Sequence, residues 1–209
     1  MATKLIVGLG NIGSEYVGTR HNAGFSVIDE LASGRSGTSA GPAEFKLVKD
    51  FHAHVGKLNI GGSNAILAKP TTYMNLSGRA VNAILNYFKI ELQDLIVVHY
   101  DVSIPLGKVR LQKGGGAGGQ HGVESIIESL GGRKEFSRLK FGVGPDPGGA
   151  RRAQYVLSRI PVEEQELYQK VVQLSAEAIS FWSSRGILES MNKYNSINLA
   201  PPPPESPPE

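Results

Sequence analysis

The sequence contains no cysteine and only one tryptophan, Trp182, among its 209 residues. Without cysteine, the chain can form no disulfide bond and can offer no thiolate to a metal ion or a substrate. No apolar run approaches the roughly 18 residues that a membrane-spanning helix needs. Residues 1–9 show neither the longer apolar run nor the small-residue cleavage site of a secretory signal. We therefore expect a cytoplasmic protein that makes no use of a membrane.

Charge is modest, with 20% charged residues, a formal net charge of +3 and a pI near 9.1. This basic balance suits an anionic partner, but it suits an ordinary enzyme equally well. The length and the 40% hydrophobic content are sufficient for one domain with a buried core, which we place at residues 1–195. The remaining segment, 196–209, holds half of the 12 prolines and is expected to be disordered or polyproline-like.

Hydrophobic patterning predicts alternating strands and helices. Apolar or alternating runs indicate strands at 4–9, 45–49, 52–58, 64–69, 95–99, 108–113 and 138–144. Helical spacing indicates helices at 20–32, 75–88, 122–130 and from 163 to about 187, with Thr19 and Asn75 as N-caps of the first two. A glycine- and serine-rich connection occupies 34–42. The fold class is therefore α/β, a single-domain three-layer αβα arrangement with a mixed β-sheet flanked by helices.

The first expected strand ends in a formal G-x-G-x-x-G motif, Gly8, Gly10 and Gly13. Such a motif can bind a dinucleotide when a helix opens inside it. Here residues 14–19 intervene before the helix, and the acidic residue expected about 20 residues on is missing, since Asp29 lies within the helix. Dinucleotide binding is therefore a weak interpretation.

His21 is expected in the first turn of the helix that follows this glycine-rich loop. The carboxyl edge of a sheet is where α/β proteins place their sites. The positive end of the helix dipole disfavours an imidazolium, which helps to keep a general base neutral near pH 7. A lone histidine is more often structural, but this position also suits a catalytic one.

Residues 69–78 form a polar loop that enters the next helix. The conservative interpretation is a strand-to-helix turn. The functional one uses the same geometry, because N–H groups at a helix start bind phosphate or carboxylate, and Tyr73 and Asn75 add side-chain hydrogen bonds.

The glycine-rich loop at 114–119 lacks the Gly-Lys-Ser/Thr ending of a nucleotide-binding P-loop, so it is better interpreted as a substrate-side loop before His121. Basic residues flank it. Dispersed charges of this kind usually form a solvated face, whereas clustered in space they would bind a phosphate backbone; they are Lys108, Arg110, Lys113, Arg133, Lys134, Arg138 and Lys140.

Taken together, these motifs resemble those of the bacterial-type peptidyl-tRNA hydrolases. The resemblance spans roughly residues 4 to 195 and rests on several segments in the same order, which is far more specific than any one of them. The matching segments are 5–11, 19–25, 69–78, 105–107 with the glycine loop, 136–144 and 155–158.

The resemblance implies an enzyme that hydrolyses the ester between a peptide and the 3′ ribose of tRNA, recycling stalled peptidyl-tRNA. It implies a monomer with tRNA as partner and with neither metal nor cofactor. It assigns the catalytic base to His21 and the discriminating amide to Asn11, which would distinguish a peptide amide from the ammonium of a free aminoacyl group. It places Tyr16, Tyr73 and Asn75 against the tRNA-peptide end.

Two positions depart from the family pattern. Tyr100 stands where the family has the aspartate that supports the catalytic histidine, and Asp101 matches the second acid of that pair. A neutral tyrosine can hydrogen-bond the ring but cannot compensate its positive charge. In a regular strand Asp101 would point to the opposite face, unless a bulge or an early strand end turned it back.

The second departure lies in 118–122, where Gln120 replaces a histidine and His121 a substrate-binding asparagine. His121 could still donate to the substrate or share the acid–base work. Losing the orienting acid of a Ser-His-Asp triad costs about 10⁴-fold in kcat in one protease. The main alternative is therefore a catalytically impaired relative that binds RNA on the same fold, and other esterases or amidases also remain open.

Overall fold

The computed structural model describes residues 2–35 and 41–201, and the seven strands found there form one mixed sheet in the order β2-β3-β4-β1-β5-β7-β6. The strands are β1 (Lys4–Gly8), β2 (Lys46–Val48), β3 (Ala53–Ile60), β4 (Ser63–Pro70), β5 (Leu95–Pro105), β6 (Val109–Lys113) and β7 (Ser137–Gly144). Strands β4, β1, β5 and β7 are parallel, whereas β2, β3 and β6 extend the two sides antiparallel. The carboxyl ends of the parallel strands therefore share one edge, where such sheets bind ligands.

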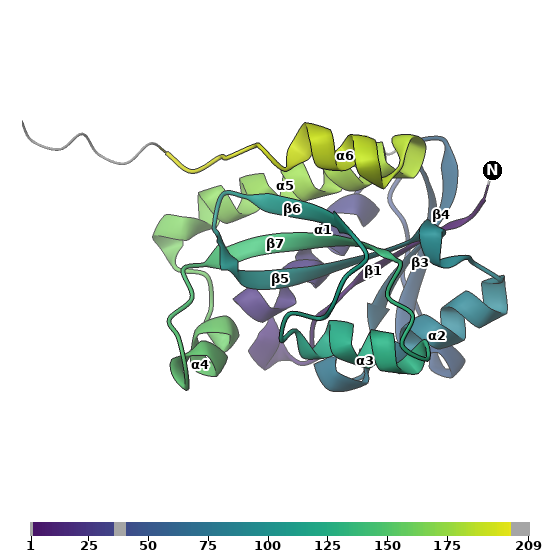
Figure 1. Ribbon diagram of the computed structural model, residues 1–209, viewed down its shortest axis with the longest axis horizontal. Coiled ribbons are helices and arrows are strands. Elements are labelled where there is room, and N and C mark those ends of the chain that lie inside the picture. The colour runs from purple at the N-terminus through teal and green to yellow at the C-terminus, as the bar shows by residue number, and fades with distance from the viewer. Residues whose placement is uncertain (1, 36–40, 202–209) are drawn as a thin grey trace, which may run out of the picture.

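Helices cover both faces of the sheet (Figure 1). The α-helices are α1 (Ala23–Ala32), α2 (Ser77–Phe88), α3 (His121–Ser129), α4 (Arg151–Leu157), α5 (Val162–Arg185) and α6 (Ile187–Tyr194). Short 3-10 turns are η1 (Ser14–Tyr16), η2 (Arg20–Asn22), η3 (Lys49–Phe51), η4 (Met74–Leu76) and η5 (Leu92–Asp94). Helices α1, α5 and α6 pack on one face, and α2 and α3 on the other. The predicted α/β class with a mixed, helix-flanked sheet is confirmed.

Strand β1 lies at the centre of the sheet and explains the apolar run near the start of the chain. Ile6 packs into the core under α1 and α5, while Leu5 and Val7 pack into the core under α2 and α3. All three side chains are fully buried. A strand covered on both faces reads as a continuous hydrophobic run, and this burial holds the end of β1 firmly beneath the candidate site.

The starts of two helices differ from the prediction. The helix expected from residue 20 begins at Ala23, after η2, and the helix expected from residue 75 begins at Ser77, after η4. Thr19 and Asn75 do not cap these helices through their side chains. In both places the chain first winds into a tighter 3-10 turn, as is common at helix N-termini, and His21 and Asn75 each lie within such a turn.

The long helix predicted from residue 163 divides at Gly186, whose φ of 80° ends α5 and lets α6 restart. Helix α4 was not predicted; it is short and buries only Val156, so it shows no apolar stripe. Strand β5 runs six residues past the predicted end at His99.

The described chain also continues to pack beyond residue 195. Ile197 and Leu199 contact the core, and the Leu199 N–H donates to the Gly107 carbonyl at 2.9 Å. Residues 202–209 of the predicted tail and 36–40 of the predicted connection lie outside the described residues. Among the helices of the described chain, none is both long and apolar enough to cross a bilayer.

Candidate active site

The candidate site lies at the carboxyl edge of the parallel strands. Asn11 follows β1, His21 lies in η2, Tyr100 lies on β5, and η4 follows β4. Asn11 and His21 are buried, with relative exposures of 9% and 7%. The sequence-predicted pair is therefore brought together by segments that converge on one end of the sheet.

A close approach of backbones sets the position of His21. A Cβ atom on Gly24 would lie 2.4 Å from the Leu9 nitrogen and 2.5 Å from the Val98 carbonyl oxygen. A Cβ atom on Gly8 would lie 2.3 Å from the Gly24 carbonyl oxygen. Only glycine at these positions lets the start of α1 rest directly on β1 and β5, and η2 precedes that contact immediately.

Two tyrosine rings lie near the imidazole of His21. Its centroid is 6.0 Å from that of Tyr16 and 5.4 Å from that of Tyr100. Burial lowers the pKa of His21 below its ordinary value of 6.5, and a hydrogen bond with Asn22 opposes this effect without reversing it. His21 is therefore neutral at pH 7, as a general base must be.

Backbone and side-chain hydrogen bonds fix Asn11. Its Oδ1 accepts the Met74 N–H at 2.9 Å, so its side-chain NH₂ group remains to donate elsewhere. Its own N–H donates to Asn22 Oδ1 and its carbonyl accepts from Asn22 Nδ2, each at 2.9 Å. Nothing in the sequence pattern marked Asn22 as functional except its place beside His21 in the matching segment.

Tyr100 and Asp101 point to opposite faces of β5, as a regular strand requires. The irregularity in the β5–β7 pairing comes after Asp101, so it does not turn that side chain toward His21. Asp101 instead accepts from Ser103 and pairs with Lys140 Nζ at 3.1 Å. Burial favours a higher pKa for Asp101, but the Ser103 and Lys140 contacts outweigh it and hold the pKa below its ordinary value. Burial raises the pKa of Tyr100, which stays neutral at pH 7.

Unlike Asn11 and His21, the other predicted contact residues lie at least partly at the surface. Tyr73 and Asn75 are exposed around η4, and Tyr16 is partly exposed. His121 also lies at the surface, where its Nδ1 is 3.4 Å from Glu124 Oε2. These four groups are accessible to a large substrate at the same edge as His21.

Gln120 has a structural task beside this site. Its Oε1 accepts the Val123 N–H at 2.9 Å and so caps α3, a role that was not predicted from the sequence. Its Nε2 lies 3.4 Å from Met74 Sδ. Gln120 thus supports the residue whose N–H holds Asn11.

One of the basic residues around the glycine loop is not available to a phosphate. Arg138 is fully buried on β7, where its guanidinium donates to the carbonyls of Gly116, at 2.7 Å, and Gly114. Its charge and donors therefore hold the glycine loop in place. Strand β7 is covered on both faces, so Arg138 and Lys140 do not share the exposure of Arg110, Lys113, Arg133 and Lys134.

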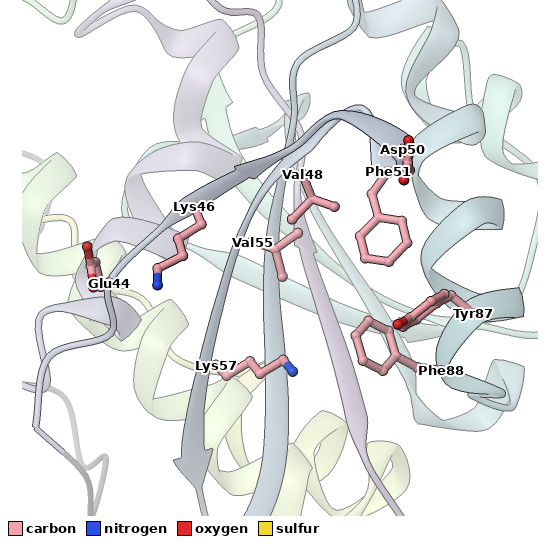
Figure 2. Close-up of a pocket in the computed structure, with 9 residues that line it drawn as sticks. All are labelled: Glu44, Lys46, Val48, Asp50, Phe51, Val55, Lys57, Tyr87 and Phe88. Carbon is pink, nitrogen blue, oxygen red and sulfur yellow. The ribbon is translucent and has the colours of Figure 1, made fainter.

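Two cavities differ in their relation to this site. A cavity of about 300 Å³ adjoins it, and its lining includes Asn11, Asn22, Phe25, Asp29 and Lys69. A larger one of about 700 Å³ lies at the β2–β3 side of the sheet, where Val48, Val55, Phe51, Tyr87 and Phe88 form its apolar part (Figure 2). None of the residues that line the larger cavity was predicted to act in catalysis. Within residues 2–35 and 41–201, no three His, Asp or Glu side chains gather as metal ligands.

The fold and the site together define a class. A neutral buried imidazole can activate water and amide groups can bind an acyl group, so this arrangement on an α/β fold suits a hydrolase that acts on an ester or amide. The family model for peptidyl-tRNA hydrolase matches residues 5–202. The chain belongs to the peptidyl-tRNA hydrolase family.

Similar proteins support this assignment over almost the whole chain. The peptidyl-tRNA hydrolase of Syntrophomonas wolfei is 44% identical over 195 residues, which cover 92% of this chain and all of the relative. That of Chlorobaculum tepidum is 45% identical over 92% of this chain and 97% of its own length. The crystal structure of the Acinetobacter baumannii peptidyl-tRNA hydrolase matches with a TM-score of 0.85 at 32% identity, covering 95% of this chain and 97% of that one. These matches favour the hydrolase over the RNA-binding alternative.

Proposed function

We propose that this chain hydrolyses the ester that links a peptide to the 3′ ribose of tRNA, with His21 as the general base. The observation that carries the proposal is the neutral, buried imidazole of His21 beside the fixed amide of Asn11. Family membership supplies the substrate, and the position of the pair at the carboxyl edge of the sheet supplies a place for its ester.

The reaction needs one proton to move away from water and one to reach the leaving group. The unprotonated nitrogen of His21 takes a proton from a water molecule, and the resulting hydroxide attacks the ester carbonyl. The tetrahedral intermediate collapses by breaking the bond to the 3′ oxygen of the ribose. The imidazolium returns its proton to that oxygen, so His21 leaves the cycle neutral.

Asn11 accounts for the preference for a peptide over a free aminoacyl group. Because its Oδ1 is occupied by the Met74 N–H, its NH₂ group is directed to other acceptors. A peptide amide carbonyl can accept that bond, whereas a free aminoacyl group presents an ammonium that cannot. Tyr16, Tyr73, Asn75 and His121 lie at the surface around this point, where we propose that they contact the tRNA-peptide end.

The acid that the family resemblance leads one to expect beside His21 is replaced by Tyr100. We propose that Tyr100 supports the imidazole by ring contact, which the 5.4 Å centroid separation allows. Asp101, paired with Lys140, acts indirectly by holding β5 and β7 together. We further propose that the enzyme works in the cytoplasm as a monomer, since one chain contains the complete set of proposed catalytic groups; sedimentation of the protein alone and with tRNA tests the monomer.

Turnover separates the proposed enzyme from a protein that only binds RNA. N-acetyl-aminoacyl-tRNA is incubated with the wild-type protein and with His21→Ala, and free tRNA and bound tRNA are both measured. We expect release by the wild type alone and binding by both proteins, because His21 acts on the water rather than on the tRNA. Tight binding without release by either protein would contradict the proposal.

A further inference from the structure

The contacts of His21 Nδ1 determine which ring nitrogen is free to act. Nδ1 lies 3.4 Å from Asn22 Oδ1, and the same oxygen accepts the Asn11 N–H at 2.9 Å. Asn22 Nδ2 donates to the Asn11 carbonyl, so the orientation of the Asn22 amide is fixed by both backbone groups of Asn11. Because this oxygen can only accept, Nδ1 of the neutral ring carries the proton and Nε2 keeps its lone pair.

No carboxylate within the described chain makes a hydrogen bond with this ring. Tyr16 of η1 and Tyr100 of β5 face it, and Asp101 points away to Lys140. Two charged groups around the site are engaged in ion pairs of their own. They are Arg20 of η2, the element that also holds His21, which pairs with Glu164, and Arg152 of α4, which pairs with Asp146.

We propose that Asn22 is the positioning residue for His21, and that in this chain a neutral amide and two tyrosine rings orient the imidazole where a carboxylate would otherwise do so. This inference rests on the proposed general-base role of His21. The amide fixes the tautomer and links the ring to Asn11, the group proposed to read the peptide. It adds no negative charge, so burial outweighs the opposing hydrogen bond with Asn22 and the pKa of His21 is lowered.

The pH dependence of turnover tests this assignment. Asn22→Asp keeps an acceptor for Nδ1 but places a negative charge beside the ring, which favours the imidazolium. Because only the neutral ring is a base, we expect the acid limb of the kcat profile to move up by roughly one pH unit. Asn86→Asp is the matched control, since it adds the same charge on the exposed surface of α2, and its limb should coincide with that of the wild type.

Removing the orienting amide should act on the chemical step. We expect Asn22→Ala to lower kcat by about 10- to 100-fold with little change in KM, because misplacing a catalytic group by about 1 Å can cost 10²-fold. Circular dichroism and a thermal melt establish that the variant is folded. A folded Asn22→Ala variant with wild-type kcat would overturn the inference.

Tyr100→Asp supplies a second test that leaves Asn22 intact. If no carboxylate now supports the ring, a carboxylate introduced at position 100 should also raise the acid limb by roughly one pH unit. An unchanged limb in both Tyr100→Asp and Asn22→Asp would show that the ring is already compensated, and the inference would be wrong. Wild-type turnover by His21→Ala would instead refute the proposed function itself, so the two failures are distinguishable.

Discussion

Replacing Gly24 with alanine should damage both stability and catalysis through one close contact. The added Cβ would meet the Leu9 nitrogen at 2.4 Å and the Val98 oxygen at 2.5 Å, whereas ordinary contact begins at 3.4 Å. The start of α1 must therefore move outward by about 1 Å. Overpacking of this kind costs about 1–3 kcal/mol. For a domain of this size, the melting temperature should fall by about 2–12 °C.

The same movement should displace His21, which lies three residues before Gly24. A misplacement of about 1 Å can lower a rate by 10²-fold, so single-turnover hydrolysis of N-acetyl-aminoacyl-tRNA should slow by that order. Gly41→Ala is the control, because a Cβ there meets nothing within 4 Å. Its melting temperature and its single-turnover rate should match those of the wild type. If Gly24→Ala melted and reacted like the control, the argument that backbone contact positions His21 would be refuted.

Further predictions concern specificity, acid stability and the glycine loop. Asn11→Asp exchanges the proposed donor for an acceptor, which costs about 1–3 kcal/mol, so the ratio of kcat/KM for N-acetyl-aminoacyl-tRNA to that for aminoacyl-tRNA should fall by roughly 5- to 150-fold. An unchanged ratio would show that Asn11 does not distinguish a peptide from a free aminoacyl group. Burial lowers the pKa of His99 to about 4, so the unfolded state binds more protons than the folded state between pH 6.5 and 4. As the pH is lowered through that range, the free energy of unfolding should fall by about 3 kcal/mol. Urea melts at several pH values should show a weaker dependence for His99→Asn, and an identical dependence would count against this account. Arg138→Lys cannot reproduce both bonds to the Gly114 and Gly116 carbonyls, so hydrogen exchange in residues 114–119 should accelerate; unchanged protection there would show that Arg138 does not hold the loop.

The sequence predicted the sheet and its covering helices well because the patterns involved were strong. The apolar run of β1 and the stripe formed by Val81, Ile84, Leu85 and Phe88 on α2 are produced directly by burial on one or two faces. Helix α4 was not predicted because a helix that buries only one residue shows no apolar stripe in the sequence. Thr19 and Asn75 were taken for caps because Thr and Asn are favoured N-cap residues, and the sequence does not show that a 3-10 turn precedes each helix.

The sequence indicated that His21 and Asn11 lie at one edge of the sheet because both follow closely on β1. Their catalytic roles stay predictions. The role of Asn22 depends on contacts with the backbone of a segment 11 residues away, and that of Gln120 on a contact with Met74, 46 residues away. The sequence left open whether Arg138 belongs to a solvated face or to a phosphate-binding one, because it shows the charge of this residue but not the carbonyls that surround it. Side-chain partners of this kind follow only from the folded chain.

The pH dependence of single-turnover hydrolysis, compared between the wild type and His21→Ala, shows whether His21 is the general base. We expect the wild-type rate to rise with pH along an acid limb whose midpoint lies below 6.5, because burial lowers the pKa of His21. We expect His21→Ala to lose this limb and about 10²- to 10⁴-fold of the rate. If His21→Ala retained the same limb and the same rate, His21 would not be the base.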